Sequence, residues 1–543
     1  MSYGRFTIRE PTNERVLEYI PKSWERITLK RELEILKKKP INLPLIIGGE
    51  EITTETQIEI RSPHDHSLIL GNASQATKKH VSDAIKSALS TKLEWMEYSW
   101  DERAAIFLKA AELLAGSYRI KMNAATMLNL SKNPHQAEID SACELIDFLR
   151  FNTYFMYKIY GEQPNSPKSQ FNRLEYRPLD GFVFAVTPFN FVSIMGNLPS
   201  APAIMGNVVL WKPASSVIYV AYKLMKLFQE AGLPDGVINF IPGRGSIVGD
   251  TILENPNLGG IHFTGSTETF DHLWQKVGEN IKNYNQYPRL VGETGGKDFI
   301  IMHRSADIKS TVTAIIQGGF EYQGQKCSAV SRVYIPKSDW KEVRDKLVNS
   351  LKDIKIGPPD EFSNFINAVI DRKSFLKIQE YLEITRQSVD AQIVFGGNTD
   401  DSKGYFIEPT IILSKEPDFK TMVDEIFGPI VTIYLYEDNK FEETLRLIDN
   451  TSKYALTGSV FASDRKAIAD ATKILRYSAG NFYINSKPTG AAVNMQPFGG
   501  SRKSGTNDKA GSFLNLLRWV STRTIKEEFL PPQDYSYPFL TRD

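Results

Sequence analysis

The sequence predicts an α/β fold with two doubly wound units, and three observations support this. The chain has 543 residues, more than a single hydrophobic core ordinarily serves. From about residue 182, short apolar runs that end in Gly or Pro alternate with helical stretches. The same alternation restarts from Arg289. Strands and helices in alternation are typical of parallel sheets with helices on both faces.

Composition excludes several classes of protein. The 65 Lys and Arg residues nearly balance the 64 Asp and Glu residues, so no basic surface for nucleic acid is indicated. No apolar run reaches the roughly 20 residues that span a bilayer. Two cysteines cannot form a disulfide framework, and the seven His residues show no zinc-site spacing. We therefore expect no nucleic acid, membrane or metal, and a cytoplasmic location, or the mitochondrial matrix if a leader has been removed.

The first half of the chain begins with helices. Residues 101–116, "DERAAIFLKAAELLAG", place Ile106, Ala110 and Leu113 at helical spacing and end on a glycine stop. A second helix is predicted over residues 137–161. Four strands then follow, in "GFVFAVTPF", "NVVLWKP", "GVINFIPG" and "GGIHFTGS".

The second half repeats this alternation. Its strands are predicted in "RLVGETGGKDFIIM", "VSRVYIP", "PIVTIYLYE", "LTGSVFAS" and "GNFYINS". Between the long helix and the first sheet strand lies "GEQPNSPKSQFNRLEYRPLDG", residues 161–181, which is rich in Pro, Ser and Asn. We predict that this segment forms a protruding hairpin.

The two cysteines lie in different settings. Cys143 is in an apolar helical stretch, as a small buried hydrophobic residue would be. Cys327 lies between Lys326 and Ser328 in "EYQGQKCSAV", a polar, turn-like setting. We expect this setting to expose the thiol and lower its pKa, as a nucleophile requires. Taken alone, the residues leave a structural cysteine and a nucleophile equally open.

Three other segments bear on Cys327. Asn190, in "TPFNF", follows the first sheet strand, where its amide could donate to an oxyanion at a switch-point crevice. Glu293 lies between glycines in "GETGGKD", and "EIFGP" places Glu425 and Phe427 just before another strand. Taken singly, each is better explained without a function: Asn190 as a turn residue, Glu293 as a helix-cap or loop charge, and Glu425 as part of a solvated face.

Seven motifs occur in a fixed order: "TPFN", "WKP", "FTGS", "GETGGK", "GQKCS", "EIFGP" and "PFGG". This set resembles the aldehyde dehydrogenase superfamily from about residue 45 onward. The resemblance implies a Rossmann-type NAD-binding domain (1–162 and 183–292) and an α/β catalytic domain (293–487). It also implies a small oligomerisation hairpin and C-terminal segment (163–182 and 488–543), in a homodimer or higher homo-oligomer.

The resemblance also implies site residues. Cys327 would be the nucleophile, Asn190 the oxyanion donor and Glu293 the general base. The residues implied around NAD are Pro188, Lys212, Gly265, Ser266, Glu425 and Phe427. No GxGxxG fingerprint is present, and "FTGSTETF" lacks the last glycine of the family's loop. The physical support for NAD is a helix N-terminus expected after Ser266.

The stretches "TPFNF", "EYQGQKCSA" and "TGAAVNMQPFGGSRKSGTNDKAG" resemble one branch, the 1-pyrroline-5-carboxylate dehydrogenases. That branch oxidises L-glutamate γ-semialdehyde to L-glutamate in proline catabolism, so its site needs anion donors for a remote carboxylate. By resemblance the substrate-binding residues are Ser328, the backbone N–H groups of Gly490 and Ala491, the rings of Phe191 and Phe498, and Glu144 at the mouth.

Other interpretations remain. Glu144 could be an exposed helix charge. The enzyme could act on another semialdehyde, or transfer its acyl group to CoA, against which Glu293 argues. A non-catalytic binding protein on the same fold is the third alternative, and the combination of Cys327, Asn190 and Glu293 counts against it.

Overall fold

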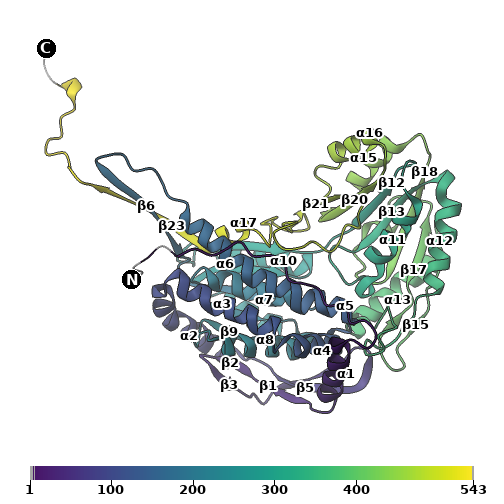
Figure 1. Cartoon of the computed structure of the whole chain (residues 1–543), viewed down its shortest axis with the longest axis horizontal. Coiled ribbons are helices and arrows are strands. Elements are labelled where there is room, and N and C mark those ends of the chain that lie inside the picture. Colours follow the sequence, from purple (N-terminus) through teal and green to yellow (C-terminus); the bar gives the residue numbers. More distant parts are fainter. Residues whose placement is uncertain (1–3, 5, 541–543) are drawn as a thin grey trace.

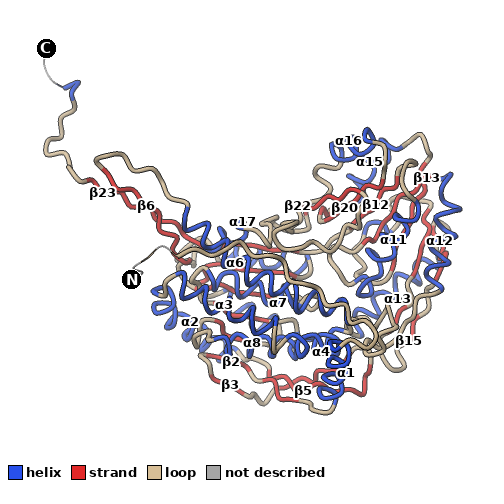
Figure 2. Tube along the Cα trace, in the orientation of Figure 1, coloured by secondary structure: helices blue, strands red, loops and turns tan. Residues whose placement is uncertain are grey.

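A computed structural model describes residues 4 and 6–540 of the chain. Two α/β lobes lie side by side, and a long two-stranded arm projects from the first lobe (Figure 1). Figure 2 shows that each lobe holds a central group of strands with helices packed around it.

The first lobe contains a seven-stranded sheet. Its strand order is β11 (Arg289–Glu293), β10 (Leu258–Thr264), β7 (Phe182–Val186), β8 (Val209–Lys212), β9 (Ile238–Phe240), β2 (Leu45–Ile47) and β3 (Glu50–Ile52). The strands from β11 to β9 are parallel, and β2 and β3 complete one edge in antiparallel pairing. The chain runs outward from β7 through β8 to β9 and then returns to the other side of β7 with β10. The sheet therefore has a topological switch point between β7 and β10, where α/β proteins bind ligands.

Helices cover this sheet, and several connect its strands. They are α1 (Trp24–Lys37), α2 (Lys78–Glu97), α3 (Trp100–Ala115), α4 (Arg119–Leu130), α5 (Pro134–Ala137), α6 (Leu145–Gly161), α7 (Val192–Ile204), α8 (Ile218–Ala231), α9 (Gly245–Leu253) and α10 (Thr267–Glu279). A small sheet of β1 (Ile41–Leu43), β5 (Asp65–Ser74) and β4 (Gln57–Ser62) lies below them. The four strands and the helix over residues 101–116 predicted for this half are confirmed.

The helix predicted over residues 137–161 is not uniform. Residues Glu138–Glu144 form a π-helical turn, and only α6 continues as a regular α-helix. Within this wider turn the Asp140 carboxylate accepts hydrogen bonds from the backbone N–H groups of Val192 and Ser193, at 2.9 Å each. Asp140 thus accepts hydrogen bonds from two N–H groups in the first turn of α7, which have no partner within the helix.

The second lobe contains another seven-stranded sheet. Its order is β14 (Ala391–Phe395), β17 (Thr410–Ser414), β18 (Ile430–Tyr436), β13 (Val330–Pro336), β12 (Asp298–Met302), β20 (Thr457–Phe461) and β21 (Asn481–Ile484). All neighbours are parallel except β14. The other elements are α11 (Ile308–Phe320), α12 (Trp340–Lys352), α13 (Arg372–Gln387), α14 (Lys420–Val423), α15 (Phe441–Thr451), α16 (Arg465–Ile474), α17 (Phe513–Leu516), β15 (Thr399–Asp400), β16 (Phe406–Ile407), β19 (Tyr454–Ala455) and β22 (Ser501–Arg502).

One predicted strand is divided between the two sheets. The run "RLVGETGGKDFIIM" was expected to open the second unit, but its first part is β11, at the edge of the first sheet, and its second part is β12. The residues 294–297 between them, which include two glycines, cross from one lobe to the other. The second sheet therefore begins after Glu293 and not at Arg289.

The hairpin predicted within residues 161–181 is also different. Its strand, β6 (Gln170–Pro178), pairs with β23 (Val520–Glu528) in a continuous antiparallel register. The sequence of 161–169 contains no second apolar run, so the partner strand comes from the C-terminal segment. Together β6 and β23 form the arm of Figure 1. Residues 1–3, 5 and 541–543 of the predicted domains lie outside the described residues.

The described residues include neither a membrane-spanning helix nor a cluster of metal ligands. Within residues 4 and 6–540, no helix is long and apolar enough to cross a membrane. The same part of the chain holds no group of three or more His, Cys, Asp or Glu residues arranged to bind a metal ion.

Candidate active site

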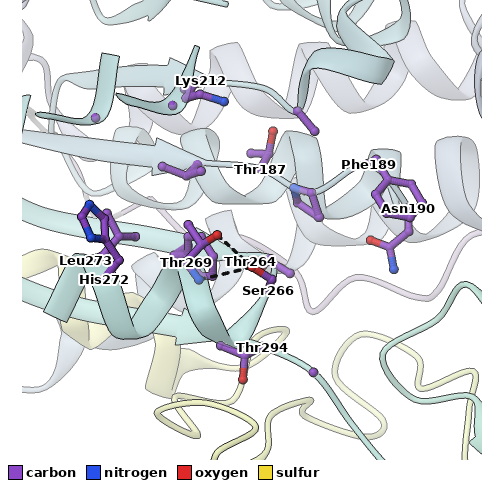
Figure 3. A pocket seen from close by; sticks show the side chains of 18 of the residues that line it. Thr187, Phe189, Asn190, Lys212, Thr264, Ser266, Thr269, His272, Leu273 and Thr294 are labelled. Atoms are coloured by element: carbon purple, nitrogen blue, oxygen red, sulfur yellow. Dashed lines mark hydrogen bonds between the residues drawn. The ribbon is translucent and has the colours of Figure 1, made fainter. Parts of the chain in front are cut away.

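A cavity of about 680 Å³ lies at the switch point of the first sheet, where the two lobes face each other. The carboxyl ends of β7, β8 and β10 form one side, and segments that precede β13 and β18 form the other. Eight of the predicted site residues line it: Pro188, Asn190, Lys212, Gly265, Ser266, Cys327, Glu425 and Phe427. In Figure 3, Asn190 lies at one end of this cavity and His272 at the other.

The end of the cavity away from Cys327 suits a dinucleotide. Lys212 donates only to the Pro213 carbonyl, at 3.3 Å, and burial lowers the pKa of its amine to about 8. Ser266 caps α10, whose N-terminus offers backbone N–H groups to an anion. Gly245 and Gly249, on α9, also line the cavity, and a Cβ on either would meet no atom within 4 Å. A half-buried lysine, a helix N-terminus and an open glycine wall fit the phosphates and flat rings of NAD.

The "EIFGP" loop is held against the "GETGGK" loop. The Glu425 carboxylate accepts a hydrogen bond from the Gly296 N–H at 3.0 Å. A Cβ on Gly295 would lie 2.3 Å from the same carboxylate, so only glycine fits there. Phe427 has a φ of 63°, which is strained for a residue with a side chain, and its ring packs edge-on against Phe189. The strain and the contacts fix the wall of the cavity nearest Cys327.

Cys327 lies at the amino end of β13, beside Asn190. One N–H of the Asn190 amide donates to the Gln325 carbonyl at 3.1 Å. The second N–H of this amide therefore lies next to the loop that carries the Cys327 thiol, called here the thiol-bearing loop. The prediction that the setting lowers the pKa of the thiol is wrong. Burial, followed by the charges of Asp298 and Glu293, raises the pKa of Cys327 well above its ordinary value. The Cys327 side chain is partly exposed and lines the cavity, as expected, but its polar sequence neighbours do not offset the surrounding carboxylates and the loss of solvent.

Glu293, at the end of β11, does not line the cavity. Its carboxylate accepts a hydrogen bond from the Gly500 N–H at 3.2 Å, and a Cβ on Gly499 would lie 3.1 Å from it. Of the two glycines of "PFGG", Gly499 thus leaves room for this carboxyl and Gly500 donates a hydrogen bond to it. Burial raises the pKa of Glu293 well above its ordinary value. The charge of Glu293 raises the pKa of Cys327, so the two groups are close enough to interact electrostatically.

The predicted substrate residues do not line this cavity. One of them, Ser328, connects the loop of two others, Gly490 and Ala491, to the loop of Cys327. The Ser328 hydroxyl is 2.8 Å from the Thr489 hydroxyl, and both side chains are buried. This hydrogen bond holds the loop that contains Gly490 and Ala491 against the thiol-bearing loop. Gly490 has a φ of 89°, so its backbone conformation favours glycine. The sequence did not single out Thr489, although it precedes two predicted backbone donors.

Phe498 lies in the same C-terminal region, where its backbone N–H donates to the Ala510 carbonyl at 2.9 Å. This bond fixes the start of the "PFGG" loop, whose glycines contact Glu293.

Phe191 and Glu144 lie near a buried ion pair, Lys132 with Asp140. The Lys132 ammonium lies between the rings of Phe191 and Tyr322, 4.2 and 4.4 Å from their centroids, and pairs with Asp140 at 2.7 Å. Sequence reasoning missed Lys132 and Asp140, since a lone Lys and a helical Asp carry no signal until the π-turn brings them together.

The alternative in which Glu144 is an exposed helix charge is wrong. Its side chain is half-buried and accepts a hydrogen bond from the Ser193 hydroxyl at 3.1 Å. Burial, with a smaller effect from the Asp140 charge, raises the pKa of Glu144 to about 8.

The chain is similar to known proteins over nearly its whole length. The model of the aldehyde dehydrogenase family matches residues 51–525. The chain is 50% identical to the mitochondrial delta-1-pyrroline-5-carboxylate dehydrogenase of Dictyostelium discoideum over 99% of this chain and 97% of the relative. It is 46% identical to the human mitochondrial enzyme of that name, over 97% and 94% of the two chains.

A solved structure is similar over its whole length. The crystal structure of the delta-pyrroline-5-carboxylate dehydrogenase from Mycobacterium tuberculosis, bound with NAD, superposes with a TM-score of 0.96 at 50% identity and covers 100% of both chains. With a family model matched over most of its length and relatives aligned end to end, this chain belongs to the aldehyde dehydrogenase family.

Proposed function

We propose that this enzyme oxidises L-glutamate γ-semialdehyde, which forms from 1-pyrroline-5-carboxylate by ring opening, to L-glutamate in proline catabolism, with NAD as the cofactor. The observation that carries the proposal is the position of Cys327. It lies between a cavity suited to a dinucleotide and a hydroxyl pair, Ser328 and Thr489, next to two predicted backbone donors. Relatives that are about half identical over their full length bear the name of this activity.

NAD fits the cavity through Lys212, Ser266 and the N-terminus of α10 at one end, and through Glu425 and Phe427 at the other. Bound NAD supplies the hydride acceptor. The protein's own part is to hold the cofactor in a partly open cleft, where Pro188 and Gly265 also line the wall. Water that the bound cofactor displaces from the cleft no longer screens its electrostatic contacts there.

Cys327 begins the chemistry. The thiol first gives up its proton to water in the cavity. The Sγ thiolate then forms a bond to the aldehyde carbon, the π bond of the carbonyl breaks, and its oxygen becomes an oxyanion. The free N–H of Asn190 and the backbone N–H of Cys327 donate to that oxyanion. Loss of one such donor typically raises the barrier by about 3 to 4 kcal/mol. After the hydride leaves, the acyl group remains on Sγ as a thioester.

Glu293 completes the cycle. Its carboxylate takes a proton from a water molecule whose oxygen attacks the thioester carbon, and the bond to Sγ then breaks to release the product acid and the thiolate. A raised pKa suits this role, because a general base is most effective when its pKa is close to the working pH. The hydrogen bond from Gly500 and the charge of Lys509 act in the opposite direction and favour the ionised form.

The substrate's α-carboxylate binds on the other side of the thiol. Thr489 orients the Ser328 hydroxyl, and the N–H groups of Gly490 and Ala491 supply further donors. Phe191 and Phe498 pack on the aliphatic chain between the two ends. Glu144, with its raised pKa, adds an acidic group at the mouth.

The chain also forms a homodimer or higher oligomer through the arm. Side chains on and beyond β6 and β23 are apolar and exposed, among them Phe171, Phe529 and Leu530, with 48%, 55% and 80% of their surface accessible. Apolar residues concentrated on a projecting element are typical of an interface with another copy. A reducing compartment, the cytoplasm or the mitochondrial matrix, stays a prediction.

Replacing the thiol tests the function directly. Cys327→Ala should abolish NADH production from 1-pyrroline-5-carboxylate, because no covalent intermediate can form. NAD binding, measured by fluorescence titration, should stay within about twofold, since the thiol binds no cofactor. Cys143→Ala, at the other cysteine, is the control and should retain activity. Substantial activity in Cys327→Ala would refute the proposed mechanism. If the wild-type enzyme oxidised a different semialdehyde with a higher kcat/KM, the proposed substrate would be wrong.

Ser328→Ala tests the carboxylate contact. It removes a hydrogen bond to a charged group, worth about 1.5 to 3 kcal/mol, so KM for the semialdehyde should rise about ten- to a hundredfold with little change in kcat. Propanal has no carboxylate, and its kcat/KM should barely change. Thr489→Val should show a weaker effect in the same direction. Equal losses with both substrates would mean that Ser328 supports Cys327 and does not bind the carboxylate.

Light scattering tests the arm. The wild-type chain should have at least twice the mass of one chain, and the double variant Phe529→Glu/Leu530→Glu should shift it toward the monomer, because charges in an apolar interface are costly. Tyr287→Glu, at an exposed position on the first lobe, is the matched control and should keep the wild-type mass. A monomeric wild-type chain contradicts the oligomer.

A further inference from the structure

The segment before the thiol has an unusual backbone. Tyr322, Gln323 and Gly324 have φ angles of 51°, 56° and 66°, so three consecutive residues are left-handed. For residues with a side chain this conformation costs about 1 to 2 kcal/mol each. All three are buried. The surrounding protein must therefore impose this turn, which ends three residues before Cys327.

The Gln323 side chain contacts both lobes. Its amide nitrogen donates to the carbonyl of Ser131, at the end of α4 in the first lobe, at 3.1 Å, and to the carbonyl of Ala368, in the second lobe, at 2.8 Å. Its amide oxygen accepts from the Asn367 N–H at 3.1 Å. One buried amide thus satisfies three backbone groups that would otherwise lack these partners.

Neighbouring contacts complete the arrangement. The Gln325 side chain accepts from the Ile370 N–H at 2.9 Å, and its carbonyl accepts from Asn190. The Ser131 hydroxyl accepts from the Ala368 N–H at 3.1 Å. A Cβ on Gly324 would lie 2.2 Å from the Gly428 carbonyl, so the turn also packs against the loop that carries Phe427.

We propose that Gln323 is a positioning residue for the reaction: by bonding the left-handed turn to both lobes, it fixes the direction in which Cys327 presents its thiol to Asn190 and the substrate. The proposal rests on the proposed function, in which Cys327 is the nucleophile. Without the amide, the turn loses its connection to Ser131 and to the 367–368 backbone. It can then relax toward the right-handed region and displace the thiol, and a displacement of about 1 Å is enough to slow a reaction about a hundredfold.

The structure offers a matched control for this amide. Asn207 is equally buried, donates to the carbonyls of Pro202 and Trp519 at 2.9 and 2.8 Å, and accepts from the Leu179 N–H at 2.9 Å. It therefore makes the same three kinds of bond at a place away from the thiol. Gln323→Met and Asn207→Leu each replace an amide with an apolar group of similar shape.

Three quantities are measured on the full-length chain. They are the melting temperature, kcat and KM with 1-pyrroline-5-carboxylate, and the rate at which iodoacetamide alkylates Cys327, followed by mass spectrometry of the peptide that contains it. Both variants should lower the melting temperature by similar amounts. Gln323→Met alone should lower kcat and the alkylation rate about ten- to a hundredfold, with KM within about threefold. Asn207→Leu should keep both rates within about threefold of wild type.

A Gln323→Met enzyme whose kcat and alkylation rate match those of Asn207→Leu would overturn the proposal, because the amide would then serve stability alone. If Gln323→Met does not fold, Gln325→Met is the second test, because it removes only the hydrogen bond from the Ile370 N–H. This variant should lower kcat and the alkylation rate to a smaller degree. Wild-type rates in Gln325→Met would also overturn the proposal. The alkylation rate does not depend on turnover. An active Cys327→Ala enzyme would refute the proposed function, whereas unchanged alkylation in the Gln323 variant would refute only this inference.

Discussion

The backbone of residues 322–324 adopts a conformation that the chain would not hold by itself. It is stable because groups from both lobes surround it, and its position decides where the thiol of Cys327 lies. The cavity has the same dependence, since the carboxyl edge of the first sheet forms one wall and the loops before β13 and β18 form the other. The site thus exists only where the two lobes meet, and small changes in their relative position change its geometry.

Several of the seven sequence motifs contact one another in the structure. The indole N–H of Trp211, in "WKP", donates to the hydroxyl of Thr187, in "TPFN", at 3.0 Å. The glycines of "GETGGK" fit against Glu425 of "EIFGP", and those of "PFGG" fit against Glu293. In each pair a small or polar residue allows a close approach. At these positions, the residue type in one motif is therefore constrained by its contact with another motif.

Much of the fold could be predicted, because local patterns determine strands and helices. The strand that contains Phe182–Val186 and the helix that ends at Gly116 follow from apolar runs and a glycine stop. The pairing of β6 with β23 could not be predicted, since the partner lies at the far end of the chain. The pKa of Cys327 was mispredicted for the same kind of reason: its sequence neighbours are polar, but burial and three carboxyls brought near it by the fold raise its pKa. Glu144 and Lys132 also acquire their setting only through the π-turn.

In the proposed reaction, Cys327 carries a thioester and Glu293 activates the water that hydrolyses it. Rapid mixing of Glu293→Gln enzyme with 1-pyrroline-5-carboxylate and NAD, followed by acid quenching and mass spectrometry, tests both parts at once. The variant should give a burst of about one NADH per site, a slow steady state, and an acyl adduct that persists on the Cys327 peptide. Slow NADH formation from the first turnover, with no adduct on Cys327, would contradict the proposed reaction.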